Sequence, residues 1–516
     1  MSELAKNQNS LLVHLKDEFA TEQIAKDIAM ALKGGLLIFL EGDLGAGKTT
    51  LARALIRHIF EDTLLEVPSP TYSLVHTYNE PNKFGISNLL HSDLYRISEP
   101  QEIEELGLLD KADDQTIIVE WPNKAEGLLG EPDLSLTLTE NGAENSSGNG
   151  RDLKISGALA TTVKRSLLIR DFIEASKTPN WQADINTGFE REKLFGDASS
   201  RSYEKISNGS ETRILMNAPR QADGPAIKDG KPYSQLAHLA EDVSAFVGVA
   251  NILQNAGLAT PQIYAQNLSE GLLLLEDLGT GTIITKDRKP IANRYEQSVQ
   301  MLAHFHERAF EKNMQLQDGN QYVVPQYSRQ AMLIETELLL EWYAPRMKGA
   351  PLKDDEKAAY FEIWNALIDK LEASEQALIL RDYHSPNIIW LEDRPNPVGV
   401  IDFQDAVIGP SAYDVASIVQ DARIDMSEDL ENSLIDAYIK SRTVKEFDKE
   451  AFEQDYAIMA AQRASKILGI FVRLDERDGK PNYLAHLPRM QDYIVRSLKH
   501  PALAAYKKWY STVIGM

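Results

Sequence analysis

Residues 42–49 of the 516-residue chain read Gly-Asp-Leu-Gly-Ala-Gly-Lys-Thr, which is the spacing of a phosphate-binding loop. Glycines at the first, fourth and sixth positions allow backbone N–H groups to converge on phosphate oxygens. Lys48 can reach the outer phosphates of ATP, and the hydroxyl group of Thr49 can ligate Mg²⁺. The sequence therefore predicts an ATP site whose residues are Gly42, Gly45, Ala46, Gly47, Lys48, Thr49 and Thr50.

Two carboxylates follow this loop in the chain and could complete a hydrolytic site. Asp93 lies in the run His-Ser-Asp-Leu-Tyr-Arg over residues 91–96, and Glu120 ends the apolar run 117–119. A carboxylate at the end of a buried strand can hold Mg²⁺ or orient water. We predict Asp93 and Glu120 as catalytic residues and Thr49 and Glu120 as metal ligands. A helix cap or turn for Asp93 and a plain strand-end charge for Glu120 are the structural alternatives.

A second set of polar residues lies in the last third of the chain. Asp382 and Asn387 stand in a D-x-x-x-x-N pattern, and Asp402 follows the short run 399–401. This pattern is typical of kinase-like phosphotransferases, in which the first Asp accepts the proton of the attacking hydroxyl group. The Asn and the second Asp hold Mg²⁺ on the ATP phosphates. We predict Asp382 as the catalytic base and Asn387 and Asp402 as metal ligands.

Two segments upstream of this pattern are typical of the small lobe of a kinase. Residues 194–201 (LFGDASSR) predict a loop that covers the nucleotide, with Ser199 as an ATP-binding residue, although an ordinary polar hairpin would look the same. Residues 272–279 (LLLLEDLG) predict the last small-lobe strand and the hinge. Two departures stand out: the predicted strand 212–216 has no Lys for the α- and β-phosphates, and Leu380 stands where many kinases have His.

The apolar pattern indicates the elements that must position these residues. A buried strand over 36–40 should precede the phosphate-binding loop, and a helix should follow it from Thr50. Strands and helices alternate up to residue 140, which predicts an α/β P-loop NTPase domain with a parallel sheet. After the linker, strands mix with some helix, and from about residue 293 the pattern is mostly helical. The second part should therefore be an α+β, two-lobed protein-kinase-like phosphotransferase domain.

The clearest break in the chain is residues 141–150, which contain no apolar residue larger than alanine. We predict a P-loop ATPase domain over residues 11–140, a flexible linker over 141–157 and a phosphotransferase domain over 158–516. The small lobe of the second domain should span about residues 158–280, and the large lobe about residues 281–516.

Composition limits the classes of function. The chain has a net charge of −23, of which the first 150 residues carry −14, so direct binding of nucleic acid by a basic surface is not expected. It has no cysteine, which excludes disulfides and thiolate chemistry. No apolar run is long enough for a membrane span, and the first residues lack a signal-peptide pattern. We expect a cytoplasmic protein with no membrane association.

Four motifs of the first part together resemble the ATPase of bacterial tRNA threonylcarbamoyladenosine synthesis, the TsaE family. They are the phosphate-binding loop and residues 67–75 (VPSPTYSLV), 91–96 (HSDLYR) and 119–122 (VEWP). The resemblance implies a partner, the threonylcarbamoyl-transferase complex of TsaB/TsaD-like proteins. The chain would then act on tRNA only indirectly, through this partner. It also implies a nucleotide-responsive loop at Thr71 and a packing role for Trp121. An independent nucleotide kinase is the alternative, but no Arg-rich lid segment follows Glu120.

The second part resembles the aminoglycoside phosphotransferase superfamily and, within it, the anomeric sugar kinases of cell-wall recycling (AmgK). The resemblance rests on residues 196–199 (GDAS), 215–219 (LMNAP), 381–387 (RDYHSPN), 402–406 (DFQDA), 413–417 (YDVAS) and 463–474. It implies an amino-sugar substrate, N-acetylmuramate or N-acetylglucosamine, that is phosphorylated at C1.

The same pattern leaves other functions open for the second part. It could be a kinase for an aminoglycoside or another small alcohol, or a non-catalytic nucleotide-binding module that regulates the ATPase. A polycationic aminoglycoside calls for carboxylates in the acceptor pocket, whereas muramate calls for a cation. Arg463, Lys466 and Arg473 recur at helical spacing and are candidates for that cation, unless they form a solvated basic helix face.

Overall fold

The computed structural model describes residues 10–80, 82–109, 113–140, 150–183, 188–194, 201–445 and 447–515. The chain forms two compact units that divide after Asn180. The first unit contains a phosphate-binding-loop fold and the second a kinase-like fold.

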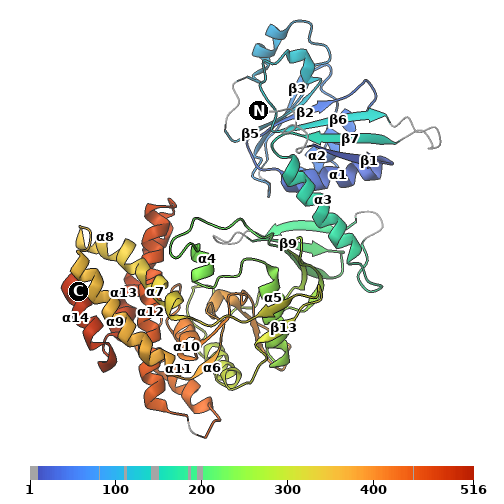
Figure 1. Ribbon diagram of the computed structural model, residues 1–516. Coiled ribbons are helices and arrows are strands. Elements are labelled where there is room, and N and C mark those ends of the chain that lie inside the picture. The colour runs from blue at the N-terminus through green and yellow to red at the C-terminus, as the bar shows by residue number, and fades with distance from the viewer. Residues whose placement is uncertain are drawn as a thin grey trace. The chain divides into compact units, whose positions relative to one another are not determined.

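The first unit is built on a seven-stranded sheet in the order β1-β7-β6-β2-β5-β4-β3 (Figure 1). The strands are β1 (Ser10–Leu15), β2 (Leu37–Glu41), β3 (Val75–Tyr78), β4 (Asn88–Asp93), β5 (Gln115–Glu120), β6 (Leu134–Glu140) and β7 (Arg151–Ser156). The helices are α1 (Glu18–Ala31), α2 (Lys48–Ile59) and α3 (Ala160–Ala175). Along β2, Ile38 and Leu40 pack with the three helices, whereas Leu37 and Phe39 pack into a second cluster. Because successive side chains of a strand point to opposite faces, both faces of this strand are covered.

The predicted α/β class is confirmed, but the sheet is mixed. Strands β6, β2, β5 and β4 pair in parallel, whereas β3 pairs with β4, and β7 with β1 and β6, in antiparallel fashion. A parallel pair needs a long crossover, and the segment between β3 and β4 is too short to provide one. The parallel centre is the part that positions the candidate site, because its strands end beside the phosphate-binding loop.

The end of the predicted linker differs from the structure. Residues 141–149 lie outside the described residues, but Arg151–Ser156 form β7, which is inserted between β1 and β6. Leu153 and Ile155 alternate with polar residues along this strand and are fully buried. Helix α3, which the sequence placed in the small lobe, also belongs to the first unit: Ala160, Val163 and Leu167 pack into the same core as α1.

The second unit begins with a five-stranded antiparallel sheet in the order β11-β12-β10-β9-β8. Its strands are β8 (Glu190–Leu194), β9 (Ser202–Ser207), β10 (Thr212–Asn217), β11 (Ile263–Asn267) and β12 (Leu272–Glu276). The accompanying helices are α4 (Tyr233–Leu236) and α5 (Val243–Asn255). This sheet is the small lobe, and β12 is the strand that the sequence predicts before the hinge.

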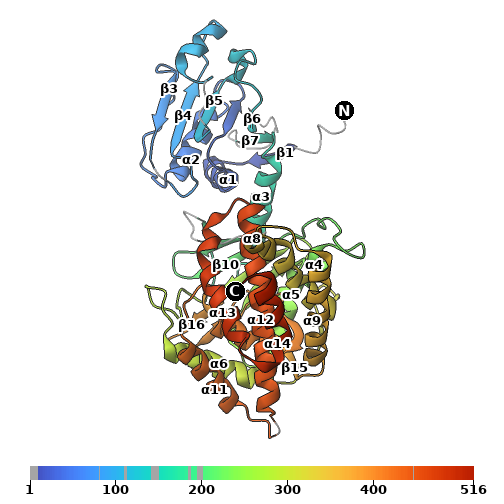
Figure 2. The ribbon, with the colours of Figure 1, turned by 90° about the vertical axis from the view of Figure 1, so that its left-hand side faces the viewer.

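The rest of the second unit is mainly helical and forms the large lobe (Figure 2). Its helices are α6 (Ala292–His306), α7 (Arg329–Leu338), the π-helical turn η4 (Leu339–Tyr343), α8 (Ala344–Lys348), α9 (Asp354–Glu372), α10 (Ala412–Val419), α11 (Glu428–Ser441), α12 (Lys449–Glu476), α13 (Leu487–Ser497) and α14 (Ala504–Val513). Short strand pairs join them: β13 (Asn313–Gln315) with β14 (Gln321–Val323), β15 (Gln376–Ile379) with β18 (Val407–Pro410), and β16 (Ile388–Trp390) with β17 (Val398–Val400). The predicted α+β kinase-like class is confirmed.

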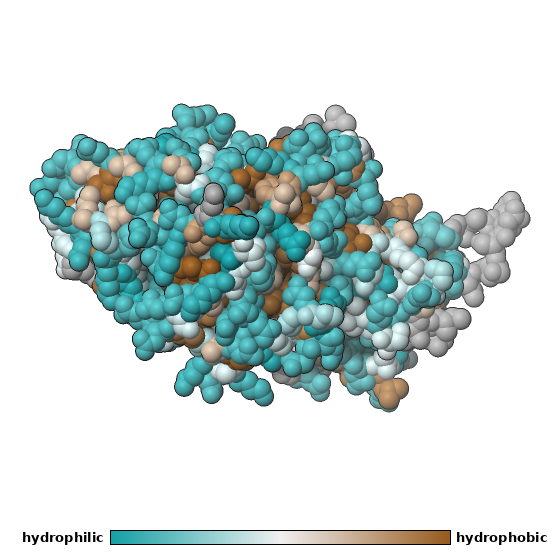
Figure 3. All heavy atoms as spheres, turned by 90° about the horizontal axis from the view of Figure 1, so that it is seen from below, coloured by the Kyte–Doolittle hydropathy of each residue, from teal (hydrophilic) through white to brown (hydrophobic). Residues whose placement is uncertain are grey.

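The surface in Figure 3 is mainly hydrophilic, with apolar side chains gathered in separate small patches. Among the residues that the structure describes, none of the helices combines the length and the apolar composition that a membrane crossing requires.

Candidate functional sites

The phosphate-binding loop connects β2 to α2, as its sequence predicts. Gly42, Gly45 and Gly47 have φ angles of 136°, 83° and 101°, a left-handed region that favours glycine. A Cβ atom on Gly42 would also lie 2.3 Å from the Leu138 carbonyl oxygen. Glycine is therefore required at this position both for the backbone angle and for the close approach of β6.

Lys48 lies at the first position of α2 and is buried. Its Nζ atom donates hydrogen bonds of 2.8 Å to the carbonyl oxygens of Gly42 and Asp43, and it lies 4.0 Å from the ring centroid of Trp121. Burial lowers the pKa of Lys48, although the carboxylates of Glu120, Asp93 and Asp43 oppose this shift. The ammonium group is thus fixed within the loop that would bind phosphate. Ala46 is buried in this loop, and Thr50 lies in the first turn of α2.

Glu120 links the loop to the centre of the sheet. It ends β5, and its Oε2 atom accepts a 3.0 Å hydrogen bond from the Thr49 hydroxyl group. Its Oε1 atom lies 3.0 Å from Nε2 of His91, a buried histidine on β4. The hydroxyl and carboxylate oxygens of Thr49 and Glu120 are ligands of the type that Mg²⁺ prefers, so this pair fits the predicted metal site. His91 was part of a sequence motif, but its contact with Glu120 could not be read from the spacing.

Asp93 lies next to Glu120 in the parallel register of β4 and β5. Its Oδ2 atom accepts hydrogen bonds from the hydroxyl groups of Thr71, at 2.5 Å, and Ser69, at 3.3 Å. Its Oδ1 atom accepts a bond from the backbone N–H of Tyr95 at 2.9 Å, which is the turn role that we considered as the alternative. Asp93 thus joins the 67–75 segment to the sheet, and it remains a candidate for assisting hydrolysis.

Arg151 is a residue at this site that the sequence did not indicate. From the start of β7, its Nε atom donates to the Ala46 carbonyl oxygen at 3.2 Å, and one NH2 group lies 3.5 Å from the Gly45 carbonyl oxygen. The guanidinium group therefore contacts the phosphate-binding loop at two of its backbone carbonyl oxygens. Because Arg151 was assigned to the linker, only the fold could reveal this contact.

In the second unit, the backbone before Asp382 is tightly held. Asp414, which is buried on α10, accepts hydrogen bonds from the N–H groups of Leu380, at 2.6 Å, and Arg381, at 2.9 Å. Arg381 has a φ of 66°, a conformation that costs a non-glycine residue about 1–3 kcal/mol. The contacts of Asp414 explain how the loop is positioned although Leu380 replaces the expected His.

The three predicted residues of the phosphotransferase pattern converge. Asn387 Nδ2 donates a 3.0 Å hydrogen bond to the Asp382 carbonyl oxygen and lies 3.5 Å from Asp402 Oδ2. This orientation makes Oδ1 the amide atom that can ligate Mg²⁺. Asp402 receives a 2.8 Å hydrogen bond from Gln404. An amide oxygen next to a carboxylate fits Mg²⁺, which usually completes its shell with water and substrate phosphates.

The two aspartates of this site have opposite pKa shifts. Burial tends to raise the pKa of Asp382, but the charges of His384, Lys466 and Arg381 outweigh it and place the pKa below the ordinary value. Burial and the Asp382 carboxylate raise the pKa of Asp402. Asp382 is thus kept ionised and can accept a proton, while Asp402 has a like-charged neighbour that a bound cation would offset.

A buried charge cluster lies under the catalytic loop. Arg381 forms an ion pair with Glu335 of α7, which also accepts a 2.8 Å hydrogen bond from Lys466 of α12. Tyr327 and Gln462 donate to the other Glu335 oxygen at 2.5 and 3.1 Å. Two cations share one carboxylate, so the cluster is net positive.

The three candidate cations of α12 have different surroundings. Lys466 belongs to the charge cluster just described, and Arg463 is buried and donates to the Gln420 carbonyl oxygen at 3.2 Å. Arg473 is half-buried, and its Nε atom has no hydrogen-bond partner among the described residues. The alternative required these three side chains to form a solvated basic helix face. Their burial and contacts show that they do not form one.

Ser199 and the rest of the segment 195–200 lie outside the described residues. Strand β10 contains no Lys, and its Arg213 pairs with Glu211 at 3.0 Å. Strand β10 therefore supplies no lysine to the ATP phosphates.

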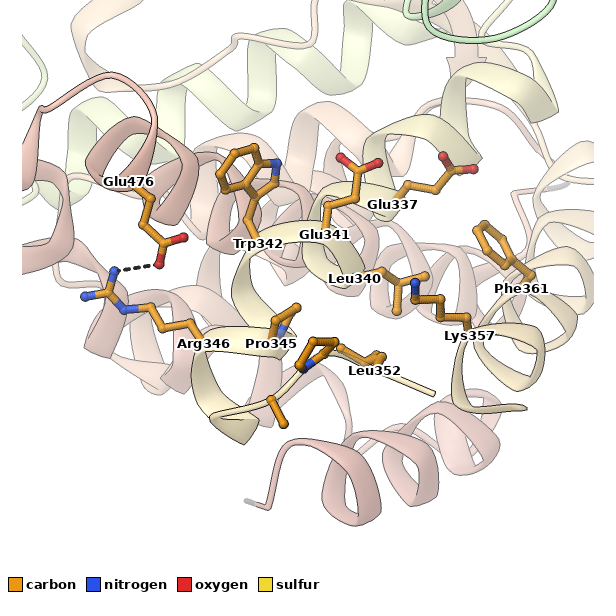
Figure 4. A pocket seen from close by; sticks show the side chains of 12 residues that line it. Glu337, Leu340, Glu341, Trp342, Pro345, Arg346, Leu352, Lys357, Phe361 and Glu476 are labelled. Carbon is orange, nitrogen blue, oxygen red and sulfur yellow. Dashed lines mark hydrogen bonds and ion pairs between the residues drawn. The ribbon is translucent and has the colours of Figure 1, made fainter. Parts of the chain in front are cut away.

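A pocket of about 680 Å³ opens between η4, α8 and α9 (Figure 4). Trp342, Glu341 and Glu337 are among its lining residues, and Arg346 pairs with Glu476 at 3.3 Å. None of the residues predicted for catalysis or metal binding lines this pocket. We assign it no part in the chemistry.

Several charged groups act on the Asp382 carboxylate. Lys466, Arg381, Arg463 and His384 all act on its carboxylate electrostatically. The Asp402 carboxylate also acts on Asp382, and Glu335 pairs with Arg381 and Lys466, so charges of both signs surround the catalytic loop.

Comparisons with known proteins find a different family in each of the two units. The family model described as "Threonylcarbamoyl adenosine biosynthesis protein TsaE" matches residues 15–149, and that of the "Phosphotransferase enzyme family" matches residues 191–453, just over half of the chain.

An N-acetylmuramate/N-acetylglucosamine kinase of Caulobacter vibrioides is 33% identical over 357 residues, which are 66% of this chain and 96% of the relative. A kinase of the same name from Pseudomonas putida is 32% identical, over 60% of this chain and 84% of the relative. The tRNA threonylcarbamoyladenosine biosynthesis protein TsaE of Haemophilus influenzae is 36% identical, over 25% of this chain and 82% of the relative.

Proposed function

Since this chain belongs to the TsaE family in its first part and to the phosphotransferase enzyme family in its second, we propose that it is a bifunctional enzyme with one active site in each unit. The first unit is an ATPase of tRNA threonylcarbamoyladenosine synthesis, and the second is an ATP-dependent sugar kinase. The convergence of Asp382, Asn387 and Asp402 carries the second assignment, because a module without catalysis has no need of all three. We place both activities in the cytoplasm, where ATP is abundant.

The acceptor of the kinase is N-acetylmuramate or N-acetylglucosamine, and the reacting group is the anomeric hydroxyl group. The names of the relatives support the sugars, and the positive groups that act on Asp382 support an acceptor that carries a carboxylate. Asp382 takes the proton of the hydroxyl group as the hydroxyl oxygen attacks the γ-phosphorus of ATP. The bond between that phosphorus and the β–γ bridging oxygen breaks, and ADP leaves. Asn387 and Asp402 would hold Mg²⁺, which neutralises charge on the phosphates when bound.

Phosphorus NMR tests the identity of the product. The purified chain, incubated with ATP, Mg²⁺ and N-acetylmuramate, should give a new anomeric phosphate signal coupled to the C1 proton. A parallel sample with kanamycin, an aminoglycoside, should give no phosphate ester. The reverse pattern would assign the unit to the aminoglycoside kinases, and the absence of any ester with a panel of sugars and alcohols would favour the regulatory module.

The ATPase acts with a threonylcarbamoyl-transferase complex of TsaB/TsaD-like proteins, and it serves tRNA only through that complex. The acidic balance of the first 150 residues supports this division, because an acidic domain repels the phosphate backbone of tRNA. Lys48 and the loop N–H groups bind the phosphates, Thr49 and Glu120 would hold Mg²⁺, and Glu120 and Asp93 assist the attack of water.

The change Glu120→Gln should lower ATP hydrolysis by the first unit at least about 100-fold, with ATP still bound. Gln has the same shape but cannot take a proton, and it is a weaker metal ligand. The rate is measured as phosphate release in an Asp382→Asn background, which silences the second site. Glu22→Gln, an exposed carboxylate on α1, is the control and should have no effect. Unchanged hydrolysis in Glu120→Gln would show that Glu120 is only a strand-end charge.

A further inference from the structure

The second unit lacks the lysine that in many kinases pairs with the ATP phosphates, although its catalytic residues converge. Four cations of the small lobe pair with carboxylates of the same lobe. These pairs are Arg191 with Glu204 at 2.7 Å, Lys205 with Asp277 at 3.5 Å, Arg213 with Glu211 at 3.0 Å and Arg220 with Glu241 at 3.6 Å.

Arg201 differs from these cations because it reaches across to the large lobe. It lies immediately before β9, and its NH1 group donates a 3.1 Å hydrogen bond to Asp402 Oδ1. Its NH2 group lies 3.9 Å from Asp405 Oδ1. The guanidinium group is largely enclosed, with 17% of the side chain exposed. It therefore lies at the carboxylate that, in the proposed function, holds Mg²⁺ against the phosphates.

We propose that Arg201 is the phosphate clamp of the kinase site and does the work of the absent lysine. A guanidinium group offers parallel N–H donors that match two phosphate oxygens, and it keeps its charge at every physiological pH. When nucleotide binds, Arg201 exchanges Asp402 for the phosphates, which releases the carboxylate for the metal. The inference rests on the proposed phosphotransferase function but not on the identity of the acceptor sugar.

Lys205 is the rival for this role. It lies on β9 two residues beyond Tyr203, and therefore on the same face of the strand. Burial and the nearby Asp402 carboxylate raise the pKa of Tyr203 to about 12, which places this face toward the catalytic site. However, Lys205 pairs with Asp277, just after β12, so its charge is directed to the hinge and not to Asp402.

Binding measurements on the full chain separate these possibilities without any acceptor. The Lys48→Ala background removes nucleotide binding by the first unit. In that background, Arg201→Ala should weaken binding of ATP in the presence of Mg²⁺ roughly 10- to 100-fold, as titration calorimetry would measure it. Binding of adenosine, which has no phosphate, should change less than about twofold, and Arg201→Lys should recover part of the ATP affinity. Arg220→Ala, which removes the same charge from an exposed position in the same lobe, should change neither ligand.

Two results would overturn the proposal. Equal losses of ATP and adenosine affinity in Arg201→Ala would make Arg201 a structural ion-pair residue. If the alanine variant fails to fold, the same two affinities are measured in Arg201→Lys. Normal ATP binding in Arg201→Ala, together with a loss in Lys205→Ala, would assign the clamp to Lys205. Failure to phosphorylate any sugar would contradict the proposed acceptor but would leave these affinities unchanged, so the two failures are distinguishable.

Discussion

Replacing Asp382 with asparagine should lower the turnover of the kinase by about 10²–10⁴-fold, which is the usual contribution of a general base. The amide has the size of the carboxylate but cannot accept the proton of the acceptor hydroxyl group. Positive charges around Asp382 hold its pKa below the ordinary value, so the native residue is fully ionised at neutral pH. The loss should therefore appear in kcat across the neutral range, not as a shifted pH profile.

A coupled assay of ADP formation with N-acetylmuramate measures this effect, and titration calorimetry in the Lys48→Ala background measures ATP affinity. The affinity should change little, because Asp382 contacts the acceptor and not the nucleotide. Asp393→Asn alters an exposed aspartate between β16 and β17 and should behave as the unchanged chain. If Asp382→Asn kept most of the turnover, another group would have to be the base.

The sequence predicts those parts of the two sites that lie within short segments. The phosphate-binding loop needs only eight adjacent residues, and Asp382 and Asn387 are brought together by one tight loop. Spacing within such segments determines geometry almost by itself, because few backbone conformations satisfy it. The positions of these residues in the structure follow from that local constraint.

The parts that the sequence did not predict depend on contacts between distant segments. Arg151 reaches the phosphate-binding loop from β7, and Asp414 reaches the catalytic loop from α10. Nothing in the local pattern around either residue indicates its partner, because the pairing depends on strand order and helix packing. Strand β7 was also hidden by the polar segment before it, although Leu153 and Ile155 show the alternation of a half-buried strand.

The largest effect on stability should come from the change Glu335→Gln. We expect it to lower the free energy of unfolding of the second unit by about 3–5 kcal/mol, the usual cost of breaking a buried ion pair from one side. Glu335 is fully buried, and its loss would leave Arg381 and Lys466 without their shared carboxylate. Because Arg381 adjoins Asp382, the kinase should lose activity as well.

Denaturant unfolding followed by tryptophan fluorescence would measure the change, with Glu337→Gln as the matched control. Glu337 lies two residues further along α7 and pairs with Lys228, whose side chain is 49% exposed, at 3.6 Å. The Glu337 side chain is 19% exposed, and burial raises its pKa, so loss of its charge should cost little and the control should remain close to the unchanged chain. Equal effects of the two variants would contradict the role of the buried cluster.

The pH dependence of Glu335→Gln gives an independent check. Burial alone would raise the pKa of Glu335, but Lys466 and Arg381 lower it to about 2, against an ordinary value of 4.5. A carboxyl group with a lowered pKa in the folded state contributes stability that is present above its unfolded pKa and is lost as the pH falls through the folded value. The difference in unfolding free energy between the unchanged chain and Glu335→Gln should therefore be constant from pH 5 to pH 8 and should shrink below about pH 4.5. A difference that instead grew on acidification would mean that the carboxylate destabilises the fold and that the two cations are held by other contacts.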